Sequence, residues 1–396
     1  MDLKYSSNSS MKPWYKKYRV LIATKTTTRP PLANINLLSD YWKEVFSNIA
    51  EQKEPAIHLL EGENVEVDID GIVWTSFTKY HLDHHEYSEQ RVIQERMGCR
   101  PTIQECLDGP RLAAGKSYRW LKRFIKRAKR EVISDSCSVL YFSDNRAQGN
   151  FYHWMIDSLS RLLIAKPSLK ESYLLLSEEQ VKKEYVIESL SLLGINKDKL
   201  LPIKKGVRYQ VKNLQVISCS IFATGACSSN GVKLVQECLS IPANEPDEFV
   251  YIARKPAFGR RIINASEFNQ VLNKFGIQTI YPEDVSFESL RNLLGNTKVL
   301  LGVYSASLTH AIFLAKGGHV IELASNKFIT STPTYWGDNY DSELSGDYYY
   351  SLSSACGLNH HLIPCAQDDE SEYALQADIF VDVGLLEKTI LQIIKQ

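Results

Sequence analysis

Residues 298–324, KVLLGVYSASLTHAIFLAKGGHVIELA, decide the fold class of this 396-residue chain. The apolar runs at 298–304 and 319–324 have the length of buried strands, and the segment 307–315 between them has the length of a short helix. A strand, a helix and a second strand in this order form a βαβ unit, in which the two strands lie parallel. The stretch therefore predicts an α/β protein with a parallel sheet.

The alternation continues on both sides of this stretch. We expect strands at 138–143, 172–177, 213–218, 249–254 and 277–281, and helices at 149–163, 231–239, 266–275, 286–295 and 381–395. A further helix is expected to end near Leu193, where Gly194 supplies a stop. Residues 241–248, IPANEPDE, carry two prolines and three acids, which is typical of a linker. We therefore predict two α/β domains, 1–245 and 246–396, although residues 1–130 show little regular pattern.

Composition excludes several classes of function. The 46 basic and 46 acidic residues balance, so no overall field attracts nucleic acid. The eight cysteines form no CxxC pair, which argues against structural zinc and a disulfide framework. Histidines and acids in the segment 79–86, KYHLDHHE, have irregular spacing, and a solvated loop is favoured over a metal site.

Location is predicted from two further observations. No segment has the pattern of a signal peptide or of a membrane-spanning helix, so we expect a cytoplasmic protein. Residues 116–130, KSYRWLKRFIKRAKR, hold eight Lys and Arg around an apolar stripe. Such a helix can lie on an anionic membrane surface, although packing on its own domain is the favoured alternative.

The segment Gly149–Leu163, GNFYHWMIDSLSRLL, places polar groups in a helix that otherwise belongs in a core. At helical spacing His153, Asp157 and Arg161 share one face. Polar groups near a core are costly unless they have partners, so these residues are candidates for chemistry. The alternative is a helix in which His153 and Asp157 only satisfy each other.

Ligands of open α/β sheets bind beyond the carboxyl ends of the strands. Four cations follow the strand at 249–254, and they are Arg254, Lys255, Arg260 and Arg261. Guanidinium groups match phosphate oxygens in pairs, so this cluster is a candidate diphosphate clamp. A solvated charged loop is the alternative.

Two further strand ends carry candidates. After the strand 298–304, Ser305 and Ser307 turn into a helix whose N-terminus can bind an anion, or they simply cap that helix. Glu322 lies in the otherwise apolar strand 319–324, where its partners are sugar or ribose hydroxyls, or else a structural hydrogen bond or ion pair.

Four of these motifs, in order, resemble glycosyltransferase family 61. The family's FHW-x-x-D segment resembles residues 151–157, with Tyr152 inserted, and its I-S/A-R segment resembles Ile252-Ala253-Arg254, followed by Arg260 or Arg261 and Asn264. Its G-x-H-G-A-G-L-T-N/H segment resembles residues 302–310, and its V-I-E-L strand resembles residues 320–323. The resemblance covers residues 138–325 and does not extend to 1–130.

The resemblance implies an inverting, metal-independent transferase that uses a nucleotide-sugar, UDP-linked in most members, and no separate cofactor. It implies a GT-B architecture of two Rossmann-like domains around a central cleft, with a last helix that crosses back. The donor-binding residues implied are Arg254, Lys255, Arg260, Arg261, Tyr304, Ser305, Ser307, Thr309, His310 and Glu322. A glycan or glycolipid of the cell surface, such as a capsular polysaccharide, is the implied acceptor.

The implied mechanism is a single displacement at the anomeric carbon, with His153 or Asp157 as the general base. On the acceptor side, Trp154 stacks on a sugar or, as favoured, packs in the core, and Arg161 pairs with Asp157. Where the family has His and two glycines, this chain has Tyr304 and two serines. Transfer of a pyruvyl or other group to a glycan, and a non-catalytic nucleotide- or glycan-binding role, remain as alternatives.

Overall fold

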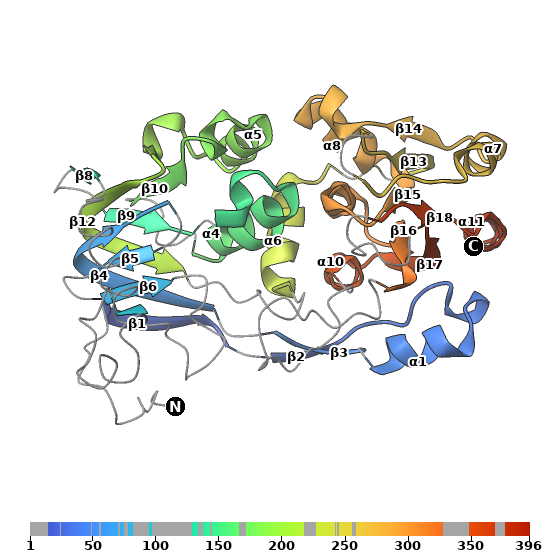
Figure 1. The fold of residues 1–396 in the computed structure, drawn as a ribbon, viewed down its shortest axis with the longest axis horizontal. Coiled ribbons are helices and arrows are strands. Elements are labelled where there is room, and N and C mark those ends of the chain that lie inside the picture. Colours follow the sequence, from blue (N-terminus) through green and yellow to red (C-terminus); the bar gives the residue numbers. More distant parts are fainter. Residues whose placement is uncertain are drawn as a thin grey trace, which may run out of the picture.

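The structure is a computed structural model. It describes residues 15–23, 25–48, 50–54, 57–69, 72–74, 78–81, 95–96, 129–133, 138–142, 145–165, 172–217, 227–241, 243, 245–255, 259–327, 348–368 and 377–396. Within these ranges it shows an α/β protein with two large sheets and a layer of helices between them (Figure 1).

The first sheet has ten strands in the order β11-β10-β9-β12-β4-β5-β6-β7, with β1 on β4 and β8 on β12. Its strands are β1 (Tyr15–Ile22), β4 (Ile57–Val67), β5 (Ile72–Trp74), β6 (Thr78–His81), β7 (Glu95–Arg96), β8 (Lys129–Val132), β9 (Ser138–Tyr141), β10 (Ser172–Ser177), β11 (Leu200–Ile203) and β12 (Val207–Ile217). The expected strands at 138–143, 172–177 and 213–218 are β9, β10 and the end of β12.

This sheet is mixed, which differs from the Rossmann-like domain that the resemblance implied. Strands β9, β10 and β11 are parallel, whereas β12 and β4 pair antiparallel over most of their length. Buried and more exposed side chains alternate along β12, a pattern typical of a sheet with one face in the core. The antiparallel half comes from β1 and β4–β7, which all lie before residue 97, where the sequence showed little regular pattern.

Helices cover the face of the first sheet that points to the second sheet (Figure 1). They are the π-helix η4 (His153–Leu159), α4 (Ser160–Ile164), α5 (Glu184–Leu192) and α6 (Ser229–Leu239), with short 3-10 turns η3 (Asn145–Gln148), η6 (Gln180–Lys182) and η7 (Lys197–Lys199). Helix α5 ends before Gly194, whose φ of 76° confirms the expected stop.

The second sheet has six strands in the order β14-β13-β15-β16-β17-β18. Its strands are β13 (Glu248–Ile252), β14 (Gln278–Ile280), β15 (Thr297–Val303), β16 (His319–Ser325), β17 (Asn359–Gln367) and β18 (Ile379–Phe380). All pairs are parallel except β17 with β18. The parallel sheet predicted from residues 298–324 is therefore confirmed, and β17 and β18 are strands that the sequence did not reveal.

The strand order places a topological switch point between β13 and β15. The chain leaves β13 for β14 on one side and reaches β15 on the other, which is the order of a doubly wound sheet. In such sheets ligands bind at the carboxyl ends of the strands on either side of the switch. Arg254 follows β13 and Tyr304 follows β15, so the candidate residues lie at the switch point.

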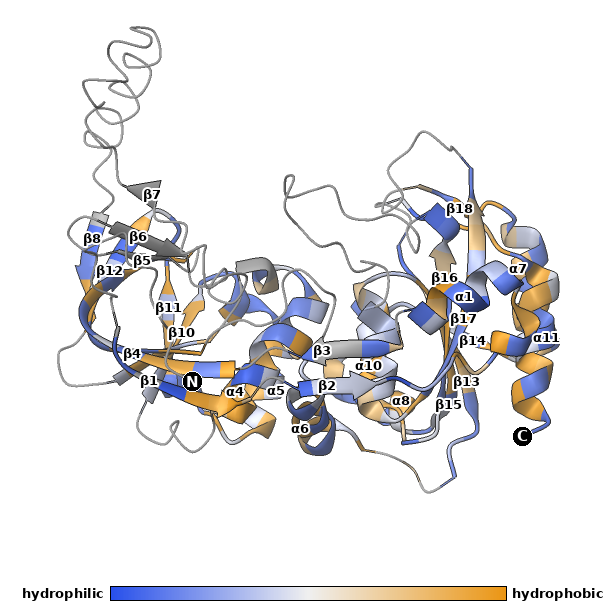
Figure 2. Ribbon diagram, turned by 90° about the horizontal axis from the view of Figure 1, so that it is seen from below, coloured by the Kyte–Doolittle hydropathy of each residue, from blue (hydrophilic) through white to orange (hydrophobic). Residues whose placement is uncertain are grey.

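Helices lie on both faces of the second sheet. They are α7 (Ala265–Lys274), α8 (Phe287–Gly295), α10 (Tyr348–Cys356) and α11 (Val383–Ile394), with the 3-10 turns η9 (Pro282–Asp284) and η10 (Ala306–Phe313). Figure 2 shows hydrophobic residues along the strands of this sheet and along α11. Helix α11 packs beside α7, whereas α8, α10 and η10 contact the helices of the first sheet.

One hydrophobic cluster joins the two helical layers. It includes Trp154 and Leu162 from the first half and Leu300, Phe313 and Leu352 from the second. Glycine allows the closest approach within the first half, because a Cβ on Gly231 would lie 2.8 Å from Ser160 Cβ. The helices between the sheets are therefore packed against each other.

The last helix does not cross to the first sheet in Figure 1, which differs from the expectation. Instead, an N-terminal segment that contains β2 (Lys25–Thr28), η1 (Ile35–Leu37), α1 (Asp40–Asn48) and β3 (Glu51–Glu54) runs along the second half (Figure 1). Leu32, Leu38 and Phe46 pack on Tyr350 and Leu362, and Asn34 Nδ2 donates to Leu362 O over 2.8 Å. Part of the predicted N-terminal domain is thus bound to the second sheet.

The expected basic helix at 116–130 lies outside the described residues except for its last two positions, which belong to strand β8. The segment 79–86 is described only through His81, in β6. Among the described residues, no helix combines the length and the apolar character needed to cross a membrane.

Gly302 on β15 gives a test of packing beneath the switch point. A Cβ at this position would lie 2.8 Å from Leu308 Cδ2 and 2.9 Å from Ile252 Cγ2. We expect Gly302→Ala to lower the free energy of unfolding by about 1–3 kcal/mol, because an added methyl must displace well-packed neighbours. Gly149→Ala is the control, since a Cβ there has no atom within 4 Å. Equal shifts for both variants in urea unfolding would contradict the prediction.

Candidate active site

His153 and Asp157 form a close pair on the π-helix η4. Asn150 caps the start of this helix by accepting a hydrogen bond from Tyr152 N over 2.9 Å. His153 Nδ1 lies 2.6 Å from Asp157 Oδ2, and the exposed fractions of the two side chains are 16% and 1%. An ionised carboxylate only accepts, so Nδ1 carries the hydrogen and Nε2 is the remaining ring nitrogen. π-turns are frequent at functional sites.

Arg161 and Trp154 have partners inside the first half. Arg161 Nε donates to the backbone oxygen of Asp157, and the Arg161 side chain is buried. Trp154 is fully buried, and its Nε1 donates to Ser189 Oγ over 3.0 Å. In this structure a sugar cannot reach the face of Trp154, which favours its core role, and Arg161 supports the backbone that carries Asp157.

An aromatic stack joins the His153 segment to the second half. The rings of Phe151 and His310 lie 4.2 Å apart between centroids and are nearly parallel, at 15°. His310 Nδ1 lies 2.7 Å from Ser307 O, so a neutral ring donates there. His310, expected to bind the donor, is therefore buried as a bridge between the halves, and the neighbouring Thr309 is buried as well.

The four cations of the predicted clamp separate into two pairs. Lys255 Nζ lies 2.5 Å from Asp284 Oδ1, and Arg261 donates to Asp378 through Nε over 2.8 Å and through NH2 over 2.6 Å. These two side chains are exposed and bound to carboxylates. They lie outside the cluster that the structure brings together.

Arg254 and Arg260 have no such carboxylate within the part of the chain that the structure describes. Arg254 NH1 and Arg260 Nε are buried without a hydrogen-bond partner there, while Arg260 NH1 donates to Tyr304 O over 2.6 Å. Burial, together with the positive charge of Arg254, lowers the pKa of Arg260 to about 10. Two desolvated cations beside each other are costly unless an anion binds between them.

The turn after β15 accommodates serines in place of the family's glycines. Among the described residues, left-handed backbone outside glycine occurs at Asn64 and Arg260 and not at 304–307, so no glycine is required there. Ser305 does not cap η10 with its side chain, and its Oγ is buried without a partner in the described contacts. The turn therefore keeps an available hydroxyl at the switch point.

Glu322 reaches the same region from β16. Register pairs Ile252 with Gly302 and Gly302 with Glu322, so Glu322 lies level with the ends of β13 and β15. Its Oε2 lies 3.0 Å from His360 Nε2, while Oε1 is buried without a partner among the described residues. The carboxylate thus contacts His360 through one oxygen and keeps the other oxygen able to accept from a ligand hydroxyl.

Tyr349 was not predicted, and it lies at the centre of this cluster. It comes from α10, and its hydroxyl donates to Ser305 O over 2.5 Å. Its ring makes edge contacts with Tyr152 at 5.9 Å and with Tyr304 at 5.2 Å, both between centroids. Tyr349 therefore connects the turn after β15 to the segment of His153, and the run of tyrosines at 348–350 was the available sequence signal.

His310 makes stability depend on pH. Burial lowers the pKa of His310 to about 4, against about 6.5 in an unfolded chain. Its contribution is therefore complete above pH 6.5, and it is lost as pH falls toward 4 because the unfolded chain takes up the proton first. Between pH 7 and pH 5 we expect His310 to account for about 2 kcal/mol of the unfolding free energy that the wild type loses. His310→Gln lacks this contribution, so its loss over the same pH range should be about 2 kcal/mol smaller. Equal losses in urea unfolding would contradict this assignment.

Within the described residues, no group of three or more His, Cys, Asp or Glu side chains is arranged to hold a metal ion. The polar atoms that the structure brings together are instead the guanidinium groups of Arg254 and Arg260, the Ser305 hydroxyl and one oxygen of Glu322. Their arrangement fits an anion beside a hydroxyl-bearing group.

Residues 151–321 match the model of a protein family described as Glycosyltransferase 61. The matched region contains His153, Asp157, both unpaired arginines and the turn after β15, and it ends one residue before Glu322. Residues 151–321 are therefore a glycosyltransferase region. Its family is glycosyltransferase family 61, which confirms the resemblance seen in the sequence. No curated protein sequence matches the chain.

Proposed function

We propose that this protein is an inverting glycosyltransferase that moves a sugar from a UDP-linked donor to a glycan. The observation that carries the proposal is the pair Arg254 and Arg260, two partly desolvated cations at the switch point. Each has one buried nitrogen, Arg254 NH1 and Arg260 Nε, without a hydrogen-bond partner among the described residues. A diphosphate offers such cations the charge and the acceptor oxygens that they lack. The glycosyltransferase family of the region supports a sugar nucleotide as the source of that diphosphate.

His153 is the proposed general base. Asp157 is buried and occupies Nδ1 of the ring, so Nε2 of the more exposed His153 accepts the proton of the acceptor hydroxyl. The acceptor oxygen then bonds to the anomeric carbon as the bond from that carbon to the diphosphate breaks. Asp157 stabilises the resulting imidazolium and holds the ring in place.

The departing diphosphate takes the electron pair of the broken bond, and Arg254 and Arg260 stabilise its growing charge. In this proposal the two guanidinium groups do the work that a divalent cation does elsewhere, so the reaction needs neither a metal nor a cofactor. Glu322 Oε1 accepts a hydrogen bond from a hydroxyl of the donor. In a UDP-sugar we assign this contact to a ribose hydroxyl. The donor thus binds to the second sheet and the acceptor approaches from His153, as in a GT-B enzyme.

The proposed setting is the cytoplasmic face of a membrane where a cell-surface polysaccharide is made. The basic and apolar pattern of residues 116–130 supports a peripheral contact with an anionic leaflet. The acceptor would then be a capsular or related glycan, free or bound to lipid.

The test is a two-part measurement on the purified chain. Calorimetry measures UDP binding, and release of UDP from a panel of UDP-sugars is followed with a mixed glycan acceptor. We expect UDP to bind and at least one UDP-sugar to turn over. Turnover with phosphoenolpyruvate and with no UDP-sugar would assign the chain to pyruvyl transfer. UDP binding without turnover of any donor would assign it a non-catalytic role.

A further inference from the structure

A cavity lies away from the switch point, between the N-terminal segment and the helical layer. It has a volume of about 160 Å³ and is bounded by β2, the end of β3, the start of α6 and α10. The residues around it that carry the argument are Thr28, Glu54, Cys227, Ser229, Ser351 and Ser354. We call it the β2–α6–α10 cavity.

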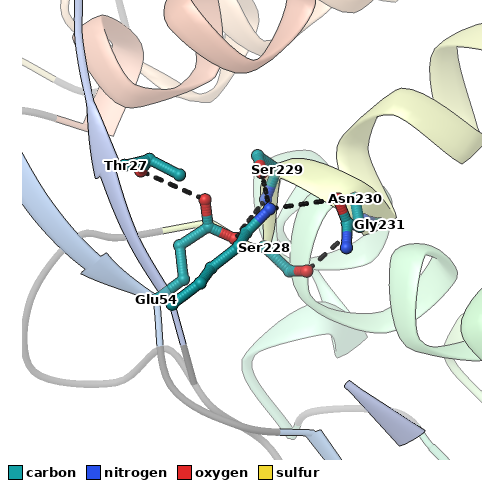
Figure 3. Close-up of polar contacts among 7 residues, drawn as sticks. Thr27, Glu54, Ser228, Ser229, Asn230 and Gly231 are labelled. Carbon is teal, nitrogen blue, oxygen red and sulfur yellow. Dashed lines mark hydrogen bonds and ion pairs between the residues drawn. The ribbon is translucent and has the colours of Figure 1, made fainter. Parts of the chain in front are cut away.

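Glu54 and Lys25, two of the charged groups at this cavity, neutralise each other (Figure 3). Glu54, which is 3% exposed, accepts from Ser229 N over 2.9 Å and from Thr27 Oγ1 over 3.2 Å. Lys25 Nζ lies 3.5 Å from Glu54 Oε2 and donates to Ser229 Oγ over 2.7 Å. The N-terminus of α6 is therefore already capped by a carboxylate, which disfavours an anionic ligand.

Hydroxyl groups are the polar groups left for a ligand. Ser351 Oγ accepts from Arg29 NH1 over 2.7 Å, and Ser229 Oγ accepts from Lys25, so each hydroxyl keeps its own hydrogen to donate. Thr28 and Ser354 add two more hydroxyls. A wall of hydroxyls both donates and accepts, which matches the hydroxyls of a neutral sugar.

The size and the remaining lining agree with one sugar ring. A buried cavity of about 150 Å³ is enough to hold a benzene ring, so about 160 Å³ admits a single six-membered ring. Ala355 and Cys227 supply small apolar contacts for the carbon-bound face of such a ring. Lys233, on the exposed side of α6, also borders the cavity.

The cavity shares its walls with the candidate active site. Helix α10 carries Tyr349 into the active-site cluster and Ser351 and Ser354 into the cavity. Cys227 lies close enough to both sites that the charges of Glu54 and Asp157 add to burial in raising the pKa of its thiol. Helix α10 and Cys227 therefore connect the cavity to the surroundings of Asp157.

We propose that the β2–α6–α10 cavity binds one neutral sugar ring of the acceptor glycan, held by the hydroxyls of Thr28, Ser229, Ser351 and Ser354. This inference rests on the proposed glycosyltransferase function. It assigns part of acceptor recognition to the N-terminal segment, which lies outside the matched family region.

The experiment uses saturation-transfer NMR on the full chain with UDP present, and the probes are the methyl glycosides of glucose, galactose, mannose, xylose and N-acetylglucosamine. We expect at least one of them to bind. Ser354→Phe, which fills the cavity, should abolish that binding, while Cys238→Phe adds the same ring on an exposed part of α6 and should leave it unchanged. Thr28→Val removes one hydroxyl at constant shape, and it should weaken binding about threefold to tenfold even if Ser354→Phe fails to fold.

Three results would overturn the proposal, and none of them depends on whether the proposed function is correct. The first is that no glycoside binds, and the second is that Thr28→Val and a folded Ser354→Phe leave binding intact. The third is displacement of the bound glycoside by inorganic phosphate at equal concentration, which would make this an anion site. UDP binding, measured by calorimetry on the same variants, should stay unchanged; if wild type binds no UDP, the proposed function fails while the glycoside measurement still stands.

Discussion

Asp157→Asn is expected to lower kcat by a factor of about 10³–10⁴ while the protein stays folded. The amide has the shape of the carboxylate, but its NH2 group is a donor and favours the ring tautomer with hydrogen on Nε2. That tautomer cannot accept a proton at the nitrogen available to the acceptor. The same exchange in a serine protease triad lowers kcat by about 10⁴.

The design includes a matched control and a test of coupling. Asp382→Asn makes the same chemical change at the cap of α11, where Asp382 accepts from Leu385 N over 2.9 Å and asparagine caps equally well. We expect its kcat to remain at the wild-type value. His153→Ala should cost about as much as Asp157→Asn, and the double variant should cost little more, because the two groups act as one unit. Additive losses, or full activity of Asp157→Asn, would show that the pair does not act in catalysis.

The second half of the chain was predictable because its local pattern and its tertiary structure agree. Strands β15 and β16 are short apolar runs, β13 is largely apolar, and α7 and α8 each have an apolar stripe of ordinary length. Fully buried parallel strands read as apolar runs, so no long-range information was needed to find them. Strand β17 escaped because His360, His361 and Pro364 interrupt its apolar pattern.

The first half was less predictable for a physical reason. Strand β4 pairs with β12 across about 150 residues of chain, and its buried apolar residues are interrupted by Glu61, the exposed Glu63 and Asn64, and Glu66. Such a strand is defined by its distant partner, and its own sequence is ambiguous. The π-helix η4, which begins at His153, is likewise determined by packing and not by a sequence pattern.

The site shows the same division. The sequence placed Arg254 and Tyr304 at strand ends, and the structure has them directly after β13 and β15. The sequence could not divide the four cations, since Asp284 and Asp378, which bind Lys255 and Arg261, are 29 and 117 residues away along the chain. Only the fold reveals which of the four cations are already bound to a carboxylate.

Lys255 and Arg261 are bound to carboxylates, whereas Arg254 and Arg260 have no such partner among the described residues. This difference predicts opposite effects for two similar substitutions. Arg254→Met removes a cation that has no ion pair within the described residues and keeps most of the side chain's volume. We expect it to weaken UDP binding about 10-fold to 150-fold, because hydrogen bonds to charged groups contribute about 1.5–3 kcal/mol. The free energy of unfolding without ligand should stay unchanged or rise, since the like charge beside Arg260 is gone.

Arg261→Met should show the reverse behaviour. It breaks the ion pair with Asp378, and because the Arg261 side chain is 65% exposed we expect a loss of up to about 1 kcal/mol in unfolding free energy. UDP binding should stay within about twofold of wild type, a difference of less than about 0.5 kcal/mol. Calorimetry and urea unfolding on both variants separate the two effects. If Arg261→Met weakened UDP binding as much as Arg254→Met, the clamp would consist of all four cations, and the carboxylates now bound to two of them would have to release them when the nucleotide binds.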